Sequence, residues 1–385
     1  MPVRIVMRGL VCWTLVAILI ISSDLCTTTN PGMKIRITKK GIDYANDIAR
    51  GILIQNLRSL RIHDQEFESG KLSCKTSDIK VTNVNYPDSQ AYLKPDSNGL
   101  QWAITDFGIS ITADYRAQYR GWWKITNSGW FRADVSGVDL WETVSFGRNG
   151  HTGRPTISHS HCSSHIRDVS IRFHGSWSWV INFFKNKIAR QIKKSLQPLI
   201  CHQVANVING NARSSLAGME VISRLADSSL VLCNNLVGAP KVTSHYLEAY
   251  GKGTFYYKFN RREPPFSPKP LPPWSSNNKE VYFWVTEYSF NTLLYQAHRF
   301  GLLKYQGALT KGDSTVDVSL KSASAPVASL TANKLTIDVS TMMEVKVRSP
   351  SYPVAKLPTT EVSINFTFEP KISQQNLVGQ ITSHR

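Results

Sequence analysis

The stretch from Cys162 to Cys201 constrains the fold more than any other part of this 385-residue chain. Its apolar residues first recur at nearly every second position, as in a strand, and after Gly175 and Ser176 they recur at helical spacing. They are Ile166, Val169, Ile171 and Phe173 in the expected strand, and Trp177, Val180, Ile181, Phe184, Ile188 and Ile192 on one face of the expected helix. We therefore expect a strand that turns into a long helix.

The opposite face of this helix is strongly basic. It carries Lys185, Lys187, Arg190, Lys193 and Lys194, with no acidic residue among them. Two interpretations remain open at this point. Either the apolar face packs on a sheet and the cations keep the other face soluble, or the helix contacts lipid.

The first 26 residues have the three-part form of a secretory signal. Arg4 and Arg8 precede twelve apolar or near-apolar residues at 10–21, and small polar residues follow as far as Cys26. Twelve residues are too few to cross a bilayer, which needs ~20. We expect a secreted, extracellular protein that is cleaved between residues 23 and 26.

Such cleavage leaves four cysteines in an oxidising compartment, and three pairings are possible. We favour Cys162 with Cys201, the pair that brackets the strand and the helix. Cys74 and Cys233 then either form a second bridge or remain free thiols. The sequon that begins at Asn365 predicts one glycosylation site, which agrees with secretion.

The net charge of +18 is concentrated in the first part of the chain. Residues 27–260 carry 29 Lys and Arg against 17 Asp and Glu, a net charge of +12, whereas residues 261–385 carry 14 against 9, a net charge of +5. A secreted basic protein is drawn to anionic surfaces such as phospholipid headgroups, lipopolysaccharide phosphates or sulfated glycans. We expect peripheral contact with anionic membranes and no nucleic-acid partner.

Most of the first half reads as strand. Residues 41–57 have the periodicity of a helix, and the long helix is expected to bend at Pro198 and end at Gly210. Alternating segments bounded by Gly, Asn, Asp and Pro predict strands at residues 57–62, 71–84, 90–93, 100–119, 124–146 and 164–173. Long strands with two helices predict an α+β domain, in which a twisted sheet is rolled into a partial barrel around the helices.

A basic tip with tryptophans is expected where two of these strands meet. Arg116, Arg120 and Lys124 flank Trp122 and Trp123. Indole rings favour the headgroup depth of a bilayer while cations meet phosphate. The alternative is that the two tryptophans point to opposite faces and at least one belongs to the core. A second basic tip is expected nearby from Arg58 and Arg61.

A proline-rich segment divides the chain. Residues 263–274 contain prolines that exclude helix and sheet interior, and they predict an extended linker. A strand at 280–285 and a short helix within 287–303 are expected to follow.

Several segments resemble the family of bactericidal/permeability-increasing protein, lipopolysaccharide-binding protein and their lipid-transfer relatives. The segments, in order, are NPGMKIRITKKGIDYA, HTGRPTISHSHCSSHI, LICHQV, EPPFSPKPLPP and VYFWVTEYSFNTLLYQAHRFGLLK. The resemblance covers residues 30–304 almost continuously. It implies two antiparallel barrels, each wrapped on long helices around an apolar lipid pocket, and a Cys162–Cys201 disulfide.

The domains implied are a signal peptide at 1–26, a lipid-binding barrel at 27–259, a linker and central sheet region at 260–279, and a second barrel at 280–385. The second barrel is expected to be incomplete, because the chain is shorter than the family pattern around residues 307–324 and ends at Arg385. In the first barrel, the resemblance implies headgroup contacts at the basic tip from Arg58, Arg61, Arg116, Arg120, Lys124 and the two tryptophans. It makes six apolar residues candidates to line or back the pocket: Ile42, Ile48, Ile52, Val180, Phe184 and Ile188.

The function implied is that of an antibacterial, innate-immune glycoprotein that binds lipopolysaccharide and phospholipid. The alternative is a phospholipid transfer or carrier protein. We expect no enzyme, cofactor or metal: there is no GxSxG or HExxH motif, and the histidines around Cys162 lie where a strand enters a helix and do not converge. In a barrel, the apolar face of the long helix is expected to face the sheet and bound acyl chains.

Overall fold

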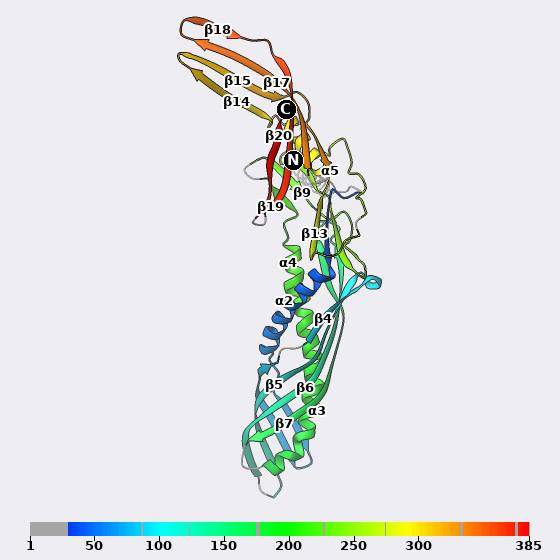
Figure 1. Ribbon diagram of the computed structural model, residues 1–385. Helices are drawn as coiled ribbons and strands as arrows, with labels where there is room; N and C mark the ends of the chain where they lie inside the picture. Colours follow the sequence, from blue (N-terminus) through cyan, green and yellow to red (C-terminus); the bar gives the residue numbers. More distant parts are fainter. Residues whose placement is uncertain are drawn as a thin grey trace, which may run out of the picture.

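The computed structural model describes residues 30–384, except for residues 86–87, 123, 175–177, 226–227, 274, 332–333 and 374–375. The molecule is elongated (Figure 1). A six-stranded sheet with two long helices forms one end, a seven-stranded sheet forms the other, and smaller sheets lie between them. The predicted signal and Trp123 lie outside the described residues.

The six-stranded sheet is antiparallel, with the order β2-β3-β5-β6-β7 and with β4 paired to β5. Its strands are β2 (Gln65–Ser69), β3 (Leu72–Val84), β4 (Asp88–Lys94), β5 (Gly99–Arg120), β6 (Lys124–Arg148) and β7 (Pro155–His174). Buried and exposed residues alternate along β5 and β6, so one face of the sheet is apolar and points inward. The predicted strand at residues 57–62 is wrong, because its first residues complete a helix.

Two helices cover the inward face. They are α2 (Lys39–Arg58), which contacts β3 and β4, and α3 (Ser178–Asn206), which contacts β6 and β7. Phe184 and Ile188 of α3 are buried with Phe107, Ile111 and Phe131 of the sheet. The apolar face of α3 therefore packs on the sheet, as the first of the two sequence interpretations predicts.

The disulfide between Cys162 of β7 and Cys201 of α3 is confirmed, with a Cα–Cα distance of 5.7 Å. The two alternatives for the other cysteines are both wrong. Cys74 is a free thiol, and its burial raises its pKa to about 11. Cys233 is disulfide-bonded. Cys74 therefore stays protonated and unreactive at neutral pH.

The helical path does not end at Gly210. Pro198 lies inside α3, and α3 passes directly into a π-helical segment, Val207–Ala212, followed by α4 (Arg213–Ala217). Gly210 is thus part of the π segment and is not a C-terminal cap. π-helical turns often mark functional sites, and this one lies over the sheet near β7.

A four-stranded sheet joins the two parts of the chain. Its order is β10-β11-β1-β13, and its strands are β1 (Met33–Thr38), β10 (Lys241–Val242), β11 (Tyr246–Gly251) and β13 (Val281–Val285). β1 pairs with β11 on one side and with β13 on the other, so strands from before and after the proline-rich segment lie next to it. As predicted, residues 261–273 and 275–278 contain no helix or strand.

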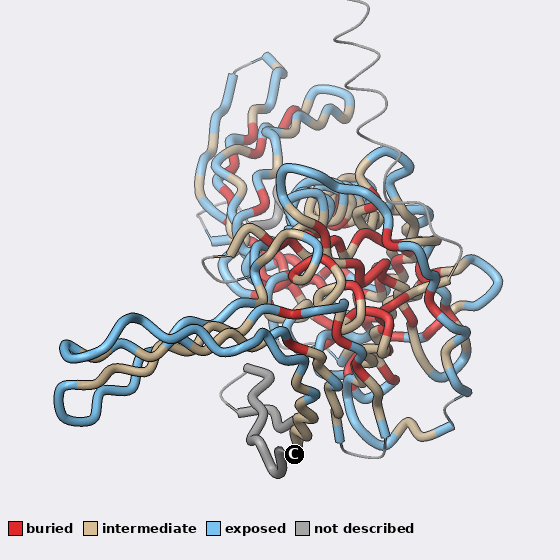
Figure 2. Tube along the Cα trace, turned by 90° about the horizontal axis from the view of Figure 1, so that it is seen from above, coloured by how far each residue is buried: buried red, intermediate tan, exposed pale blue. Residues whose placement is uncertain are grey.

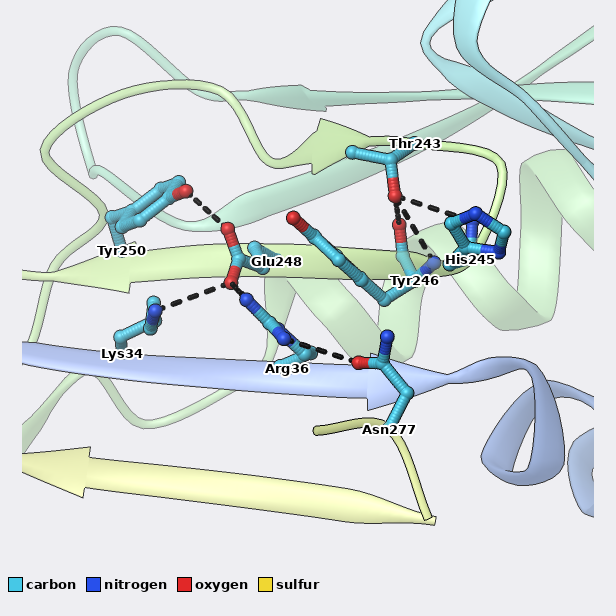
Figure 3. Close-up of polar contacts among 8 residues, drawn as sticks. All are labelled: Lys34, Arg36, Thr243, His245, Tyr246, Glu248, Tyr250 and Asn277. Atoms are coloured by element: carbon cyan, nitrogen blue, oxygen red, sulfur yellow. Dashed lines mark hydrogen bonds and ion pairs between the residues drawn. The ribbon is translucent and has the colours of Figure 1, made fainter. Parts of the chain in front are cut away.

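A buried ionic cluster fastens this sheet (Figure 3). Glu248 accepts a hydrogen bond from Arg36 Nε at 2.8 Å, lies 3.2 Å from Lys34 Nζ, and accepts a hydrogen bond from the Tyr250 hydroxyl. Burial alone would raise the pKa of Glu248, but the hydrogen bonds from Tyr250 and Arg36 and the charge of Lys34 lower it below its usual value. Arg36 also donates to Asn277 Oδ1 at 3.1 Å, which ties the residues just after the proline-rich segment to β1.

Two further sheets complete the described part of the chain. A three-stranded sheet contains β8 (Ile222–Arg224), β9 (Leu230–Cys233) and β12 (Thr254–Tyr257), and α5 (Glu287–Arg299) packs on β12. The seven-stranded sheet contains β14 (Lys304–Lys311), β15 (Ser314–Ser322), β16 (Val327–Thr331), β17 (Lys334–Ser349), β18 (Tyr352–Lys356), β19 (Thr360–Ser373) and β20 (Asn376–His384).

This seven-stranded sheet has little core of its own. β14 and β18 are almost wholly exposed, and Figure 2 shows projecting hairpins with little burial. Among the described side chains after residue 300, Ala328 is the only buried hydrophobic one. In the described part of the chain after residue 280, α5 is the only helix and has 13 residues, so the expected long helices are not found in this half.

We predict that Glu248→Gln destabilises the protein by about 3–5 kcal/mol, because it leaves Lys34 and Arg36 buried without their carboxylate. As a control, Asp43→Asn removes an exposed i,i+4 pair with Lys39 and should cost less than about 0.5 kcal/mol. Chemical denaturation followed by circular dichroism measures both. Equal losses for the two variants would contradict a dominant role for the buried cluster.

Candidate functional site

An apolar cavity of about 330 Å³ lies between the helices and the inward face of the six-stranded sheet. Its wall is made by α2, by the end of α3 with the π segment, and by β4, β5, β6 and β7. The lining residues are Ile42, Ala45, Asn46, Ala49, Ile52, Leu53, Asn56, Ala91, Leu100, Trp102, Glu142, Val144, Phe146, Ile157, Gln203, Val204, Val207, Ile208 and Ala212. Ala45 and Ala49 place small side chains where larger ones would fill this space.

One side of the cavity borders solvent along α2. Ile52 lines the cavity and is 44% exposed. Tyr44 and Ile48, at four-residue spacing before it, are 69% and 51% exposed. These three residues form an exposed apolar stripe beside the cavity, because residues four apart lie on the same helix face.

Most polar groups on the cavity wall are hydrogen-bonded to other protein groups. Asn46 accepts a hydrogen bond from Trp102 Nε1 at 2.7 Å and donates to the Ser89 carbonyl at 3.1 Å. Gln203 donates to Asn56 Oδ1 at 3.4 Å. These bonds make the wall chemically close to hydrocarbon even where its residues are polar.

Glu142 is the exception. It is 1% exposed, and its Oε1 lies 2.7 Å from His159 Nδ1, while its Oε2 has no hydrogen-bond partner among the described residues. Burial raises the pKa of Glu142 above its usual value, and the hydrogen bond and charge of His159 oppose that rise without cancelling it. The cavity therefore contains one carboxyl group that is only half satisfied.

Of the five predicted pocket residues whose side chains the structure describes, two line the cavity. Ile42 and Ile52 line it, whereas Ile48 does not line it and lies on the exposed stripe of α2. Phe184 and Ile188 are 0% and 1% exposed and belong to the core farther along α3. The side chain of Val180 lies outside the described residues. The wall residues contributed by β4–β7 and the π segment were not predicted.

The predicted basic tip is a hairpin between β5 and β6. Arg120 pairs with Lys124 at its base, and Trp122 in the turn is 94% exposed. The Arg120 N–H donates to the carbonyl of Lys71 at 2.7 Å, so the turn between β2 and β3 adds a further cation. Arg116 is also exposed, and it lies four residues before Arg120 on β5. The tip thus joins cations to an exposed indole.

Arg58 and Arg61 do not lie at this tip. Arg61 forms a β-bridge with Lys80, and Lys80 pairs with Thr112 of β5. Thr112 is eight residues from Arg120, about 26 Å along an extended strand. Arg58 is the last residue of α2 and Arg61 follows it halfway up the sheet, and the expectation that they form a tip nearby is corrected by this register.

The predicted glycosylation site Asn365 lies in β19, paired with Asp338 of β17. Its side chain donates to Asp338 Oδ1 at 2.5 Å. Glycosylation there stays a prediction.

Comparison with known proteins agrees with this architecture. A sequence model described as the N-terminal domain of the LBP / BPI / CETP family matches residues 41–216. The model of the C-terminal domain of the same family matches residues 224–311. The two matches together span more than half of the chain. The chain belongs to the LBP / BPI / CETP family.

Individual relatives of the family are similar at moderate identity. The chain is 27% identical over 301 residues to bactericidal permeability-increasing protein of Sebastes schlegelii, covering 76% of this chain and 61% of that protein. It is 29% identical over 303 residues to lipopolysaccharide-binding protein of Mus musculus, covering 76% and 60%. The chain thus spans about 60% of the length of these curated relatives.

The fold is also shared with a solved structure. A crystal structure of lipopolysaccharide binding protein superposes with a TM-score of 0.64 at 22% identity, covering 92% of this chain and 83% of that one. Within the described ranges, no helix is long and apolar enough to span a bilayer. The same ranges contain no group of three or more His, Cys, Asp or Glu residues placed to hold a metal ion.

We predict that Glu142→Gln removes a pH dependence from unfolding. A raised pKa in the folded state means that wild-type stability falls as pH rises from about 4.5 through that pKa, because the buried carboxyl must ionise. The melting temperature of the variant relative to wild type should therefore increase with pH across this window and then level off. Thermal melts at matched ionic strength between pH 4 and pH 8 measure the difference, and a constant difference would contradict the assignment.

Proposed function

We propose that this family member is a secreted, antibacterial protein of innate immunity that binds lipopolysaccharide and phospholipid. The observation that carries the proposal is the apolar cavity between α2, α3 and the sheet, which has room for one acyl chain of such a lipid. The names of the relatives, which include lipopolysaccharide-binding proteins of several mammals, support the same conclusion.

The chemistry of the cavity fits an acyl chain. A cavity of ~150 Å³ lined by apolar side chains holds one benzene molecule, so about 330 Å³ holds roughly a dozen carbon atoms on that scale. Each buried methylene contributes about 0.8 kcal/mol. One chain of this length is therefore a strong anchor, and two chains of a diacyl lipid do not fit together in this volume.

The chemistry of the hairpin tip fits an anionic headgroup region. Arg120, Lys124 and Lys71 surround a turn that exposes Trp122. Cations meet phosphate while an indole ring sits at headgroup depth. Glu68 forms an ion pair with Arg120 at 3.9 Å, but both side chains are well exposed, so the pair is weak and the tip keeps its positive charge.

The cavity and the tip act on different molecules. Trp102 at the cavity and Arg120 at the tip are eighteen residues apart on β5, which corresponds to about 50–60 Å. The hydrocarbon part of one bilayer leaflet is about 15 Å thick. One lipid cannot reach from one site to the other, so we propose that the tip holds the protein on a lipid surface while the cavity holds a separate chain.

A carrier of host phospholipid is the second candidate function. It is favoured by the exposed apolar stripe of Tyr44, Ile48 and Ile52 beside the cavity, which offers a path for a chain to enter from a lipid particle. Transfer of fluorescent phospholipid between vesicles that lack lipopolysaccharide separates the two functions. Transfer favours the carrier, and its absence together with lipopolysaccharide binding favours the first proposal.

We predict that Ala49→Phe weakens binding of a fluorescent twelve-carbon fatty acyl probe by at least about tenfold, because the ring occupies space that several methylenes would use. Gln55→Phe, which adds the same ring to an exposed position of α2 outside the cavity wall, is the control and should leave affinity unchanged. Fluorescence titration measures both. Equal affinity of Ala49→Phe and wild type would show that the chain binds elsewhere.

We predict that replacing Arg120 and Lys124 together by Ala weakens binding to immobilised lipopolysaccharide, most strongly at low salt, where exposed charges are least screened. Replacing Arg58 and Arg61 by Ala changes the net charge equally away from the tip and serves as the control. Surface plasmon resonance at two ionic strengths measures the affinity of wild type and of both double variants. Equal losses for both double variants would mean that net charge matters and the tip does not.

A further inference from the structure

The cavity ends abruptly at one row of the six-stranded sheet. Its last wall residues on β5 and β6, toward the hairpin tip, are Trp102 and Glu142, which pair across the two strands. The next inward-facing pair in that direction is Ile104 and Leu140, and both are 0% exposed and belong to the main core. The sheet therefore passes from cavity wall to close-packed core within two residues, and Trp102 lies at that boundary.

Trp102 is the largest residue of the cavity wall, and it joins two apolar clusters. It packs against the main core, which contains Leu53 and Val204, and against a smaller cluster, which contains Ile42 and Ala91. All four of these residues also line the cavity. The cavity thus lies between the two clusters, and the side chain of Trp102 contacts both of them.

A hydrogen bond holds the indole ring in place. Trp102 Nε1 donates to Asn46 Oδ1 at 2.7 Å, and Asn46, which is 8% exposed, donates in turn to the Ser89 carbonyl of β4 at 3.1 Å. Turning the ring away would break the first of these bonds inside an apolar space, where a lost hydrogen bond is costly. A ligand chain therefore meets a fixed ring at this end of the cavity.

Solvent reaches the cavity elsewhere, along α2 and at the other end of the sheet wall. Ala45 and Ile52 of α2 are exposed, and Phe146 and Ile157, which pair between β6 and β7, are only half-buried. A polar headgroup stays on this open side, because burying it against apolar side chains would be costly. The methyl end of a bound chain consequently points toward the closed end, at Trp102.

We propose that Trp102 sets the longest alkyl chain that the cavity buries. The inference rests on the proposed function, because it requires a chain in the cavity. Chains of up to about a dozen carbons are buried completely, on the same volume scale as before. The further methylenes of a longer chain stay in water at the open side and add nothing to affinity. A smaller side chain at position 102 enlarges the cavity that it lines, so longer chains are then buried.

The experiment uses the full chain and alkylphosphocholines from octyl to octadecyl, titrated below their critical micelle concentrations by isothermal titration calorimetry. For wild type, affinity should rise about fourfold per methylene and stop rising at about twelve carbons. Trp102→Ala should move this break to about sixteen carbons, and the milder Trp102→Leu should move it to about fourteen, because the wall collapses only partly into the space left. If Trp102→Ala does not fold, as judged by circular dichroism, Trp102→Leu carries the test.

Phe146→Ala is the matched control, because it removes a ring from the opposite end of the same wall. It should lower affinity for all chains by a similar factor and leave the break at the wild-type length. A break that stays at that length in the Trp102 variants, or that moves in Phe146→Ala and not in them, would overturn the role of Trp102 while leaving the cavity as a chain-binding site. If wild-type affinity does not rise with chain length, the proposed function of the cavity fails and this inference fails with it.

Discussion

The covalent bond between Cys162 and Cys201 fixes the distance between β7 and α3, and the cavity depends on that distance. Cys162 pairs across the sheet with Glu142, and Cys201 precedes Gln203 and Val204 on the helix, so both ends of the bond are next to cavity residues. On one side of the bond, Phe184, Ile188 and Leu196 pack the helix tightly onto the sheet. On the other side, the helix becomes π-helical and the small residues of α2 face it. The disulfide thus stands between a filled core and an open cavity, and it holds the helix against β7 at the boundary between them.

The length of the strands separates the two proposed sites on the six-stranded sheet. Because β5 and β6 run for 22 and 25 residues, their hairpin carries its cations and Trp122 far from the cavity at the other end. Contact with an anionic surface is a matter of exposed charge and falls with ionic strength. Chain burial is a matter of apolar area and is insensitive to salt. The surface contact proposed for the tip and the chain binding proposed for the cavity can therefore change independently, because the effects of mutations at distant sites usually add.

The sequence predicts local elements well and the cavity poorly, for a physical reason. Periodicity reports which face of an element is apolar, so the strand before the long helix, the helix itself, α2 and the Cys162–Cys201 bond could all be anticipated. It does not report where two apolar faces fail to meet. Phe184 and Ile188 have the same helical spacing as cavity residues, yet they fill the core. Val207 and Ile208 line the cavity from a π-helical segment where the sequence predicted the last turn of an α-helix. Likewise, Arg58 and Arg61 are placed by the pairing of Arg61 with Lys80, which no local pattern encodes.

Two buried glutamates show how differently the fold surrounds the same side chain in two places. Glu248 is surrounded by Lys34, Arg36 and the Tyr250 hydroxyl, and its pKa is lowered despite burial. Glu142 has only His159, and burial raises its pKa. A buried carboxylate stays ionised when several donors and cations contact its oxygens, whereas burial with a single partner favours the protonated form. Glu248 meets the first condition and fastens the sheet that joins the two parts of the chain. Glu142 meets the second, because its Oε2 has no hydrogen-bond partner among the described residues.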